Sequence, residues 1–389
     1  MTLSHLDSRE LLAAAEKATD LRDYGEIDPR PSLQALVQSI NEEALLNDAT
    51  LDSKRLSLIR VLCNRLLLQD EIRSNPRIEA EVIRKPIVIL GLPRSGTTKL
   101  HRMIAADPAM QKLPLWKLFF PVKALTPGPG TDIERRIAAT EAAVRIIQET
   151  NPEQYAGHPM MALEPDEEYF GMELSFQAHI NTSSIYTPSY ERWLETQDFT
   201  NWYIWLRKFL QYQQYVAGGA GRPWVLKAPH HLGFLPLLFR FFPDATVVHC
   251  HRDPVTTVTS FCALLGAARG KSSDHYRADE VGPYILRIYR KRMRDYLRDR
   301  AALEKTHPFV DLDYRRILTD APRVIAECYA AADIALDPAG VAAMRAWEVA
   351  NEQHKHGQHK YSLDGYGITA TDIRDAFHDY NERFGAYLS

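Results

Sequence analysis

The stretch that decides the fold is Pro86-Ile-Val-Ile-Leu-Gly-Leu-Pro-Arg-Ser-Gly-Thr-Thr98. Its residues 87–90 are β-branched or aliphatic, which is typical of a short strand buried in a parallel sheet. Gly91 and Gly96 then permit a tight turn, after which aliphatic residues recur at helical spacing. Because the first N–H groups of a helix are free and carry partial positive charge, such a turn can bind an anion. The stretch therefore predicts a strand, a phosphate-binding loop and a helix.

The loop is similar in spacing to the nucleotide-binding pattern GxxxxGK[ST], but it differs where that pattern has its lysine. Position 97 is a threonine. The missing lysine normally reaches the β- and γ-phosphates, with the next hydroxyl on Mg²⁺, so its absence disfavours a metal-assisted triphosphate enzyme. Arg94 instead places a cation inside the loop, where its guanidinium can donate several hydrogen bonds to a diphosphate-like group. A structural turn without a ligand is the alternative.

Residues 91–98, Gly-Leu-Pro-Arg-Ser-Gly-Thr-Thr, resemble the 5′-phosphosulfate loop of sulfotransferases that use 3′-phosphoadenosine 5′-phosphosulfate (PAPS). The tyrosylprotein sulfotransferases and their bacterial relatives show nearly the same string. The resemblance implies that the 5′ end of PAPS is held by Arg94 and the residues after it, namely Ser95, Gly96, Thr97 and Thr98.

A second strand-to-helix corner follows later in the chain. Residues 246–250 read as a central strand, Asp253 as a helix N-cap and Pro254 as the first helical residue. Arg252 and Ser260 are eight residues apart, which is the spacing of the arginine and serine that hold the 3′-phosphate of PAPS in sulfotransferases. The resemblance therefore assigns both residues to PAPS binding. A surface ion pair between Arg252 and Asp253 is the alternative.

A third motif, Lys-Ala-Pro-His-His, follows a short predicted strand at residues 224–226. It is similar to the Lys-x-Pro-x-His of the bacterial relatives. The resemblance implies that Lys227 stabilises the developing charge and that His231 removes the acceptor proton. His230 could take that role after a one-residue shift. The alternative is a histidine pair that caps a helix at residues 232–241.

Asp166, Glu167 and Glu168 form an acidic run after Pro165. We expect them to form the first turn of a helix and to complement its dipole rather than to act in catalysis. A Pro-Asp-Glu-Glu turn also occurs in the bacterial relatives, so Glu167 remains a third candidate for the base. Lys117 stands where those relatives often have a glutamate, which leaves no carboxylate at that position of the loop.

Basic side chains gather near the C-terminus, in residues 354–362. Three histidines there could ligate zinc, but the acidic or thiol partners of zinc sites are missing. The segment is similar to the His-x-Tyr-Ser-Leu of the bacterial relatives, which implies a loop that closes over the nucleotide. We therefore favour contacts with PAPS from His359, Lys360 and Tyr361 over a metal site.

The predicted fold class is α/β, a P-loop-like parallel sheet flanked by helices, with an N-terminal helical appendage. Residues 1–80 are expected to be that helical subdomain, and residues 81–389 the sulfotransferase-like domain. A helical, aromatic-rich insertion is expected at about residues 130–218, where some rings would line a pocket for an apolar or aromatic alcohol. The last predicted helix covers residues 369–384.

Composition excludes several classes of partner. A net charge of −3 over 389 residues gives no general attraction to nucleic acid, and the basic run at residues 287–300 is interleaved with aspartates. The four scattered cysteines indicate reduced thiols and a cytoplasmic setting. No apolar stretch has the length of a membrane span, so we expect none.

Together these features predict a cytoplasmic PAPS-dependent sulfotransferase that needs no metal. An acceptor hydroxyl, on a small alcohol or phenol, would attack sulfur in line and expel 3′,5′-phosphoadenosine. One alternative is a P-loop small-molecule kinase, which needs Mg²⁺ and normally a lysine at position 97. A nucleotide-binding protein without catalysis is the other. The sequence leaves open the acceptor, the pathway and the oligomeric state, a homo-oligomer included.

Overall fold

The computed structural model of the chain describes residues 5–219, 221–273, 275–351 and 361–388. Its centre is a four-stranded parallel sheet in the order β2-β1-β3-β4. The strands are β1 (Ile87–Leu90), β2 (Val225–Lys227), β3 (Thr246–His251) and β4 (Phe309–Asp313). This architecture confirms the predicted α/β class, and β2 lies one residue later than expected.

Side chains alternate along each strand, so neighbouring residues of one strand point to opposite sides of the sheet. Each side is covered by a different set of helices. Ile87, Ile89 and Val248 pack with α4 (Thr97–Ala106), α15 (Ala321–Ala331) and α16 (Pro338–Ala350) in one buried cluster. On the other face, Val88 and Val247 pack in a larger cluster. The helices near the sheet that contribute to this cluster are α11 (Leu235–Phe241), α12 (Pro254–Ser272) and α13 (Val281–Leu303).

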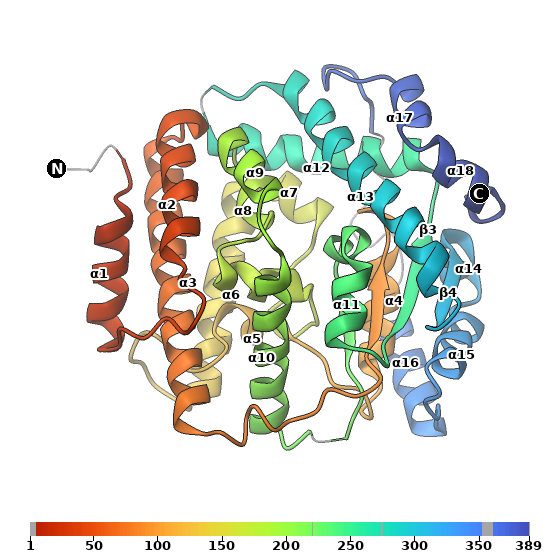
Figure 1. Cartoon of the computed structure of the whole chain (residues 1–389), viewed down its shortest axis with the longest axis horizontal. Helices are drawn as coiled ribbons and strands as arrows, with labels where there is room; N and C mark the ends of the chain where they lie inside the picture. The colour runs from red at the N-terminus through yellow and green to blue at the C-terminus, as the bar shows by residue number, and fades with distance from the viewer. Residues whose placement is uncertain (1–4, 220, 274, 352–360, 389) are drawn as a thin grey trace.

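Three N-terminal helices lie at the end of the molecule opposite β4 (Figure 1). They are α1 (Ser8–Thr19), α2 (Arg30–Ser39) and α3 (Asp48–Ser74), as the sequence predicts for this region. Helix α3 begins after Asn47, because the Asn47 side chain accepts from the backbone N–H of Thr50 and caps it. Leu62 and Leu66 share one buried cluster with Val88 of the sheet, so this layer packs onto the rest of the chain.

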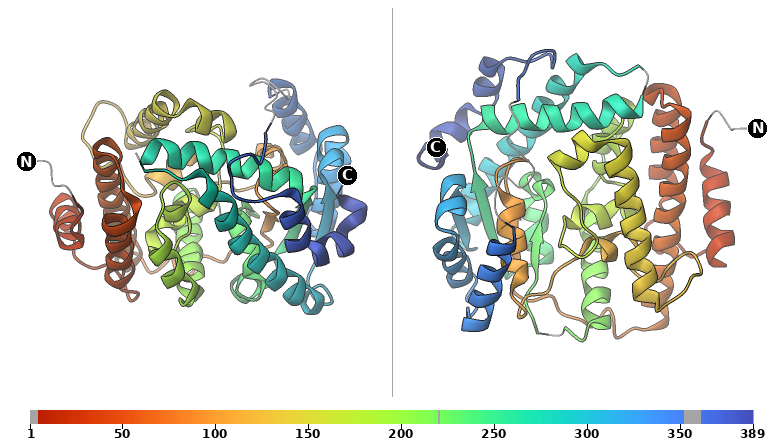
Figure 2. Two further views of the ribbon diagram at one scale, coloured as in Figure 1. Left: turned by 90° about the horizontal axis from the view of Figure 1, so that it is seen from above. Right: turned by 180° about the vertical axis from the view of Figure 1, so that it is seen from behind.

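The insertion lies between these helices and the sheet, as the views in Figure 2 show. Its helices are α6 (Asp132–Thr150), α7 (Pro152–Gly157), α8 (Ile180–Ser183), α9 (Pro188–Glu195) and α10 (Thr200–Val216). A 3-10 segment, η2 (Glu168–Ser175), joins α7 to α8. The remaining helices are α5 (Leu115–Phe119), α14 (Tyr314–Thr319), α17 (Ala370–Ala376) and α18 (His378–Phe384).

Two predicted helices are divided. The helix expected at residues 369–384 breaks at Phe377, whose backbone leaves the helical region (φ −113°) while its side chain is buried against the core. The helix expected at 232–241 is a 3-10 turn, η3 (Pro229–Gly233), followed by α11. In both places tertiary packing, not helical spacing, sets the boundary.

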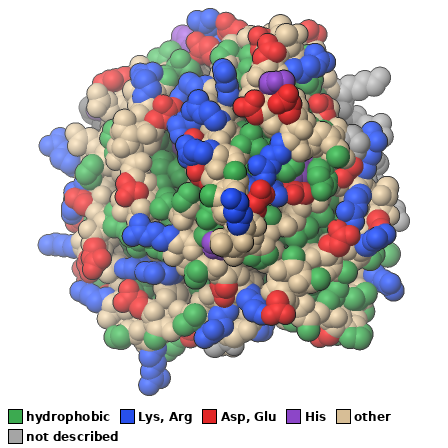
Figure 3. Space-filling view, turned by 45° about the vertical axis from the view of Figure 1, so that its right-hand side comes forward, with side chains coloured by type: hydrophobic (Ala, Val, Ile, Leu, Met, Phe, Trp, Pro, Cys, Tyr) green, Lys and Arg blue, Asp and Glu red, His purple; other side chains and the backbone are tan. Residues whose placement is uncertain are grey.

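Charges of both signs are interspersed on the face shown in Figure 3. The basic run of α13 is laced with ion pairs, since Lys291 lies 2.7 Å and Arg298 3.0 Å from carboxylate oxygens of Asp295. Among the described helices, none combines the length and the apolar composition needed to cross a lipid bilayer.

Candidate active site

The loop between β1 and α4 depends on its two glycines. A Cβ on Gly91 would lie 2.5 Å from the Cys250 carbonyl oxygen of the neighbouring strand. Gly96 has φ +86°, and a Cβ there would lie 2.8 Å from the ring of Tyr314. Between them Arg94 also has positive φ, 74°, which costs a residue with a Cβ roughly 1–2 kcal/mol. The loop is therefore held in one strained and closely packed shape, with its arginine fixed.

Arg94 and the second corner are in direct contact. The Arg94 Nε donates to Ser260 Oγ over 3.2 Å, and its guanidinium also donates to the Gly157 carbonyl. Arg252 Nη1 donates to the Arg94 carbonyl oxygen over 2.9 Å, and the Arg252 guanidinium lies 3.9 Å from the centre of the Tyr314 ring. The two predicted donor-binding corners thus meet at one edge of the sheet, where the strands end.

The start of α12 explains why Ser260 reaches this edge. The Asp253 side chain accepts from the backbone N–H of Thr256 over 2.8 Å, so it caps the helix as predicted. Pro254 takes the first helical position, where no intrahelical N–H is needed. Ser260, nearly two turns later, is 5% exposed and faces the β1–α4 loop through its bond with Arg94.

Lys227, at the end of β2, is buried beside the same loop. Its Nζ donates to Glu167 Oε1 over 2.6 Å and lies 3.4 Å from Thr98 Oγ1. The Lys227 side chain is 1% exposed, whereas that of Glu167 is 16% exposed. Lys227 therefore lies within hydrogen-bonding distance of both a carboxylate and the first turn of α4.

His231 is held at both ring nitrogens. Its Nε2 lies 2.7 Å from Glu168 Oε1 and its Nδ1 lies 2.8 Å from the Tyr203 hydroxyl, with the imidazole fully buried. The other oxygen of Glu168 accepts from the backbone N–H of Lys227 over 2.8 Å. Burial opposes ionisation of Glu168, but the bonds from His231 and Lys227 outweigh it and lower the pKa of this carboxyl. His231 therefore fastens η2 and α10 to the end of β2.

The acidic run does lie at the start of a helix, with Glu167 at the N-cap and Glu168 in the first turn of η2. Its burial was not expected, since Asp166 and Glu168 are 2% and 0% exposed. Burial would raise the pKa of Asp166, yet His158, 3.2 Å away, and Lys227 keep that pKa below its usual value. The partners His158, Arg102 and Tyr203 were not identified from the sequence. The signal that could have pointed to them was the Pro-Asp-Glu-Glu string.

His230 points away from His231 into a set of aromatic rings. Its ring centre lies 4.5 Å from that of Trp202 and 4.7 Å from that of Phe234. Burial, followed by the charge of Arg292, lowers the pKa of His230 well below its usual value, so this histidine is neutral. The two histidines thus have different surroundings, and neither caps a helix through its side chain.

The predicted C-terminal residues are only partly covered. His359 and Lys360 lie outside the described residues. Tyr361 is described and is 37% exposed. Their contacts with PAPS remain a prediction.

One buried group among the described residues has the composition of a metal site. His249, His251 and Asp311 place their ligand atoms within 4.8 Å of one another. Asp311, however, already accepts from both terminal nitrogens of Arg300, each over 2.6 Å. A metal ion would have to displace this guanidinium, so the residues present do not favour one.

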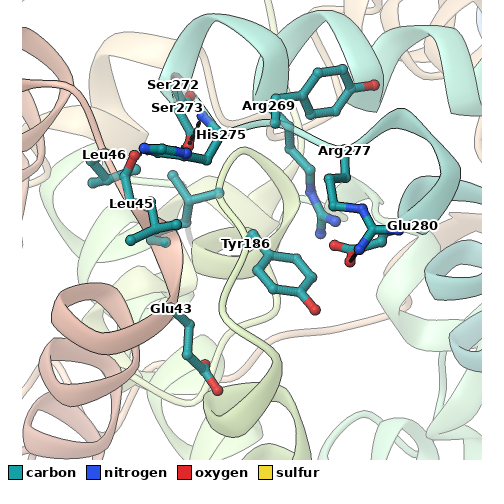
Figure 4. A pocket seen from close by; sticks show the side chains of 13 residues that line it. Glu43, Leu45, Leu46, Tyr186, Arg269, Ser272, Ser273, His275, Arg277 and Glu280 are labelled. Atoms are coloured by element: carbon teal, nitrogen blue, oxygen red, sulfur yellow. Dashed lines mark hydrogen bonds and ion pairs between the residues drawn. The ribbon is translucent and has the colours of Figure 1, made fainter.

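A pocket of about 140 Å³ lies apart from these residues, between the end of α12 and residues 43–46 (Figure 4). Leu45, Tyr186 and Arg269 are among its lining residues. It contains none of the predicted site residues.

Comparison with known proteins supports one family. The model of the sulfotransferase family matches residues 86–338. The crystal structure of sulfotransferase STF1 from Mycobacterium tuberculosis H37Rv is 29% identical, with a TM-score of 0.81 over 97% of this chain and 99% of that one. The structure of sulfotransferase STF9 from Mycobacterium avium is 24% identical, with a TM-score of 0.86 over 99% and 98%. Curated proteins gave no match. The family model spans the sheet and both predicted donor-binding corners, and the chain belongs to the sulfotransferase family.

Proposed function

We propose that the protein transfers the sulfuryl group of PAPS to a hydroxyl of a small apolar or aromatic acceptor. The observation that carries the proposal is the contact between the two corners, in which Arg94 bonds Ser260 and receives a bond from Arg252. A donor with charge at both its 5′ and 3′ ends fits two cations placed side by side at one sheet edge. The Lys227–Glu167 pair beside Thr98 then supplies a hydrogen-bond donor and a base for the transfer.

The donor would be bound by the chain's own cations and amides. Arg94, with the backbone N–H groups of residues 95–98 at the start of α4, is proposed to hold the 5′-phosphosulfate. Arg252 and Ser260 are proposed to hold the 3′-phosphate. Both arginines are already fixed by neighbours, so little side-chain freedom would be lost on binding.

The reaction would be an in-line displacement. The acceptor oxygen forms a bond to sulfur while the bond from sulfur to the bridging oxygen breaks, and the leaving group is 3′,5′-phosphoadenosine. Negative charge grows on the bridging oxygen, and Lys227 and Arg94 are the donors proposed to stabilise it. Because these cations are oriented before the reaction, their stabilisation costs no rearrangement when the charge develops.

The resemblance assigns the base to His231, and the geometry leads us to reassign it. Both nitrogens of His231 are engaged and its side chain is buried, so no lone pair is available to an acceptor. We propose Glu167, whose carboxylate is partly exposed and held 2.6 Å from Lys227. Glu167 takes the proton of the acceptor hydroxyl, while Lys227 keeps its own proton and donates a hydrogen bond to the leaving oxygen.

The cysteines favour the cytoplasm as the site of this reaction. Cys63, Cys250, Cys262 and Cys328 are all buried free thiols. Unpaired thiols are typical of a reducing compartment.

Calorimetry with 3′,5′-phosphoadenosine, ADP and ATP in EDTA tests the donor, and labelled PAPS with a panel of alcohols and phenols tests the transfer. We expect 3′,5′-phosphoadenosine to bind at least ~10-fold more tightly than ADP, because only it offers a 3′-phosphate to Arg252. Transfer that requires Mg²⁺ and ATP would select a kinase instead. Binding of 3′,5′-phosphoadenosine without transfer to any acceptor would select a non-catalytic protein.

A further inference from the structure

A cluster of rings surrounds His230 next to the Lys227–Glu167 pair. We name it the His230 cluster; its other members, all with ring centres 4.5–6.0 Å from that of His230, are Tyr169, His179, Phe199, Trp202 and Phe234. Tyr169 directly follows Glu167 and Glu168 in η2, and the Trp202 ring meets His231 edge-on at 5.6 Å. Tyr169, His179 and Phe234 are only half-buried, so the cluster reaches the surface.

Arg292, on α13, enters this cluster without a charge partner. It is 7% exposed, and its Nη2 lies 3.5 Å from His230 Nδ1. Its guanidinium lies 5.4 Å from the centre of the Tyr289 ring. No carboxylate or backbone carbonyl within the described ranges bonds it. Gly233 makes its approach possible, since a Cβ there would lie 3.0 Å from the Arg292 Cγ.

The other buried arginines that the structure describes are all satisfied by oxygen. Arg65, Arg136 and Arg269 donate to backbone carbonyls, and Arg102 also does so, beside Asp166. Arg300 forms a two-armed pair with Asp311. Because an unpaired buried cation is costly, a buried guanidinium without an oxygen partner indicates that a ligand supplies one.

The bond from Arg292 also fixes the role of each ring nitrogen of His230. Arginine can only donate, so the bond from Arg292 requires that Nδ1 accept and that the proton of this neutral imidazole lie on Nε2. The Nε2 of His230 is buried and has no partner among the described residues, as is true of the indole N–H of Trp202. The cluster therefore contains a cation and two hydrogen-bond donors that lack acceptors. This tautomer also leaves His230 without a free lone pair to act as the base.

We propose that the His230 cluster recognises the acceptor, and that the acceptor carries a carboxylate in addition to its hydroxyl. Arg292, held in place by His230 Nδ1, binds the carboxylate, while the half-buried rings of Tyr169 and Phe234 contact its apolar skeleton. This inference rests on the proposed function, because it places the acceptor hydroxyl at Glu167.

A carboxylate fits the donors better than a phosphate. One guanidinium can donate to both oxygens of a single planar anion. A phosphate would bring a second negative charge close to Glu167, and the cluster has no second cation to balance it.

Matched acceptors test the charge. We would measure kcat/KM with labelled PAPS for 4-hydroxybenzoate, 4-hydroxyphenylacetate and 3-(4-hydroxyphenyl)propionate, each beside its neutral amide. We expect kcat/KM for the best acid to be at least ~10-fold higher than for its amide, because the acid forms a hydrogen-bonded ion pair. In Arg292→Gln this preference should disappear through a higher KM for the acid, with the amide changed less than ~3-fold. Arg294→Gln, an exposed arginine of the same helix, should keep the preference.

Equal use of acids and amides by the unchanged protein, or equal losses for both in Arg292→Gln, would overturn the inference. Weaker binding of 3′,5′-phosphoadenosine by Arg292→Gln would assign Arg292 to the donor and also overturn it. Failure of the proposed function is a separate result, in which no acceptor of any charge is sulfated.

Folding and binding are checked without turnover. Removing an unpaired buried cation should not lower the Tm, whereas loss of a structural arginine would. In the presence of 3′,5′-phosphoadenosine, the acids should raise the Tm of the unchanged protein and not that of Arg292→Gln. His230→Phe, which keeps a ring but removes the Nδ1 that accepts from Arg292, should weaken acid binding less than Arg292→Gln. An acid that stabilises all three proteins equally would contradict the inference.

Discussion

The proposed donor edge, which comprises Arg94, Arg252, Ser260 and Lys227, and the His230 cluster lie side by side, yet they differ in how their polar groups are satisfied. At the donor edge Arg94 bonds Ser260, Arg252 bonds the Arg94 carbonyl, and Lys227 pairs with Glu167. In the cluster, Arg292 lacks an oxygen partner and the Nε2–H of His230 lacks an acceptor among the described residues. The fold thus builds one site complete and leaves the other for a ligand to complete. We therefore expect substitutions at the satisfied edge to lower stability as well as activity, and substitutions in the His230 cluster to lower activity more than stability.

The largest effect is expected from Glu167→Gln. Loss of the proposed base should lower kcat by ~10²- to 10³-fold, while affinity for 3′,5′-phosphoadenosine changes little. Steady-state kinetics and calorimetry measure the two quantities, and Glu153→Gln, an exposed carboxylate on α7, is the control. A fall of less than fivefold would return the base to another residue.

His231→Ala should chiefly affect stability. It leaves Glu168 buried without its imidazole partner, so the free energy of unfolding should fall by about 3 kcal/mol. Urea titration measures this loss, and His231→Gln should recover part of it because an amide can still donate to Glu168. If His231→Gln is stable but loses ~100-fold or more in kcat, His231 is the base after all.

Arg252→Ala tests whether Arg252 binds the 3′-phosphate. Affinity for 3′,5′-phosphoadenosine should fall by at least ~10-fold, with a much smaller change for AMP, which lacks that phosphate. Calorimetry on both ligands gives the comparison, and Arg290→Ala, an exposed arginine of α13, is the control. Equal losses for the two nucleotides would remove Arg252 from this contact.

An effect on stability alone is expected at Asp311, which bonds His251 and Arg300. Burial opposes its ionisation, but bonds from His251 and Arg300 outweigh it and lower the pKa of Asp311 to about 2. A carboxyl with a lowered folded pKa stabilises the protein above its unfolded pKa, and this stabilisation is lost as the pH falls towards 2. Asp311→Asn should therefore be less stable than the unchanged protein by about 2 kcal/mol at neutral pH.

Urea titrations at several pH values test this linkage. The difference in stability between Asp311→Asn and the unchanged protein should shrink as the pH falls through the acid range. A difference that is constant with pH would mean that the ionisation of Asp311 does not support the fold.

The elements that sequence predicted well are those whose causes lie within a few residues. The strand at 87–90, the turn that needs Gly91 and Gly96, and the Asp253 cap are all present. The strand depends on local conformation, Gly96 on its own positive φ, and the cap on a bond to a residue three positions away. The burial of Glu168 was missed for the opposite reason, since Glu168 meets His231 across a separation of 63 residues.

By itself, the sequence determined the α/β class and the two corners that bring Arg94 and Arg252 to one edge, because parallel strands end on the same side of a sheet. Only the tertiary structure decided what the adjacent histidines do. The packing of η2, α10 and α13 against β2 surrounds His231 with Glu168 and Tyr203, and places His230 beside an unpaired Arg292. His230 and His231 are adjacent in the chain but have different roles, because distant helices supply their partners. No local sequence pattern encodes those partners.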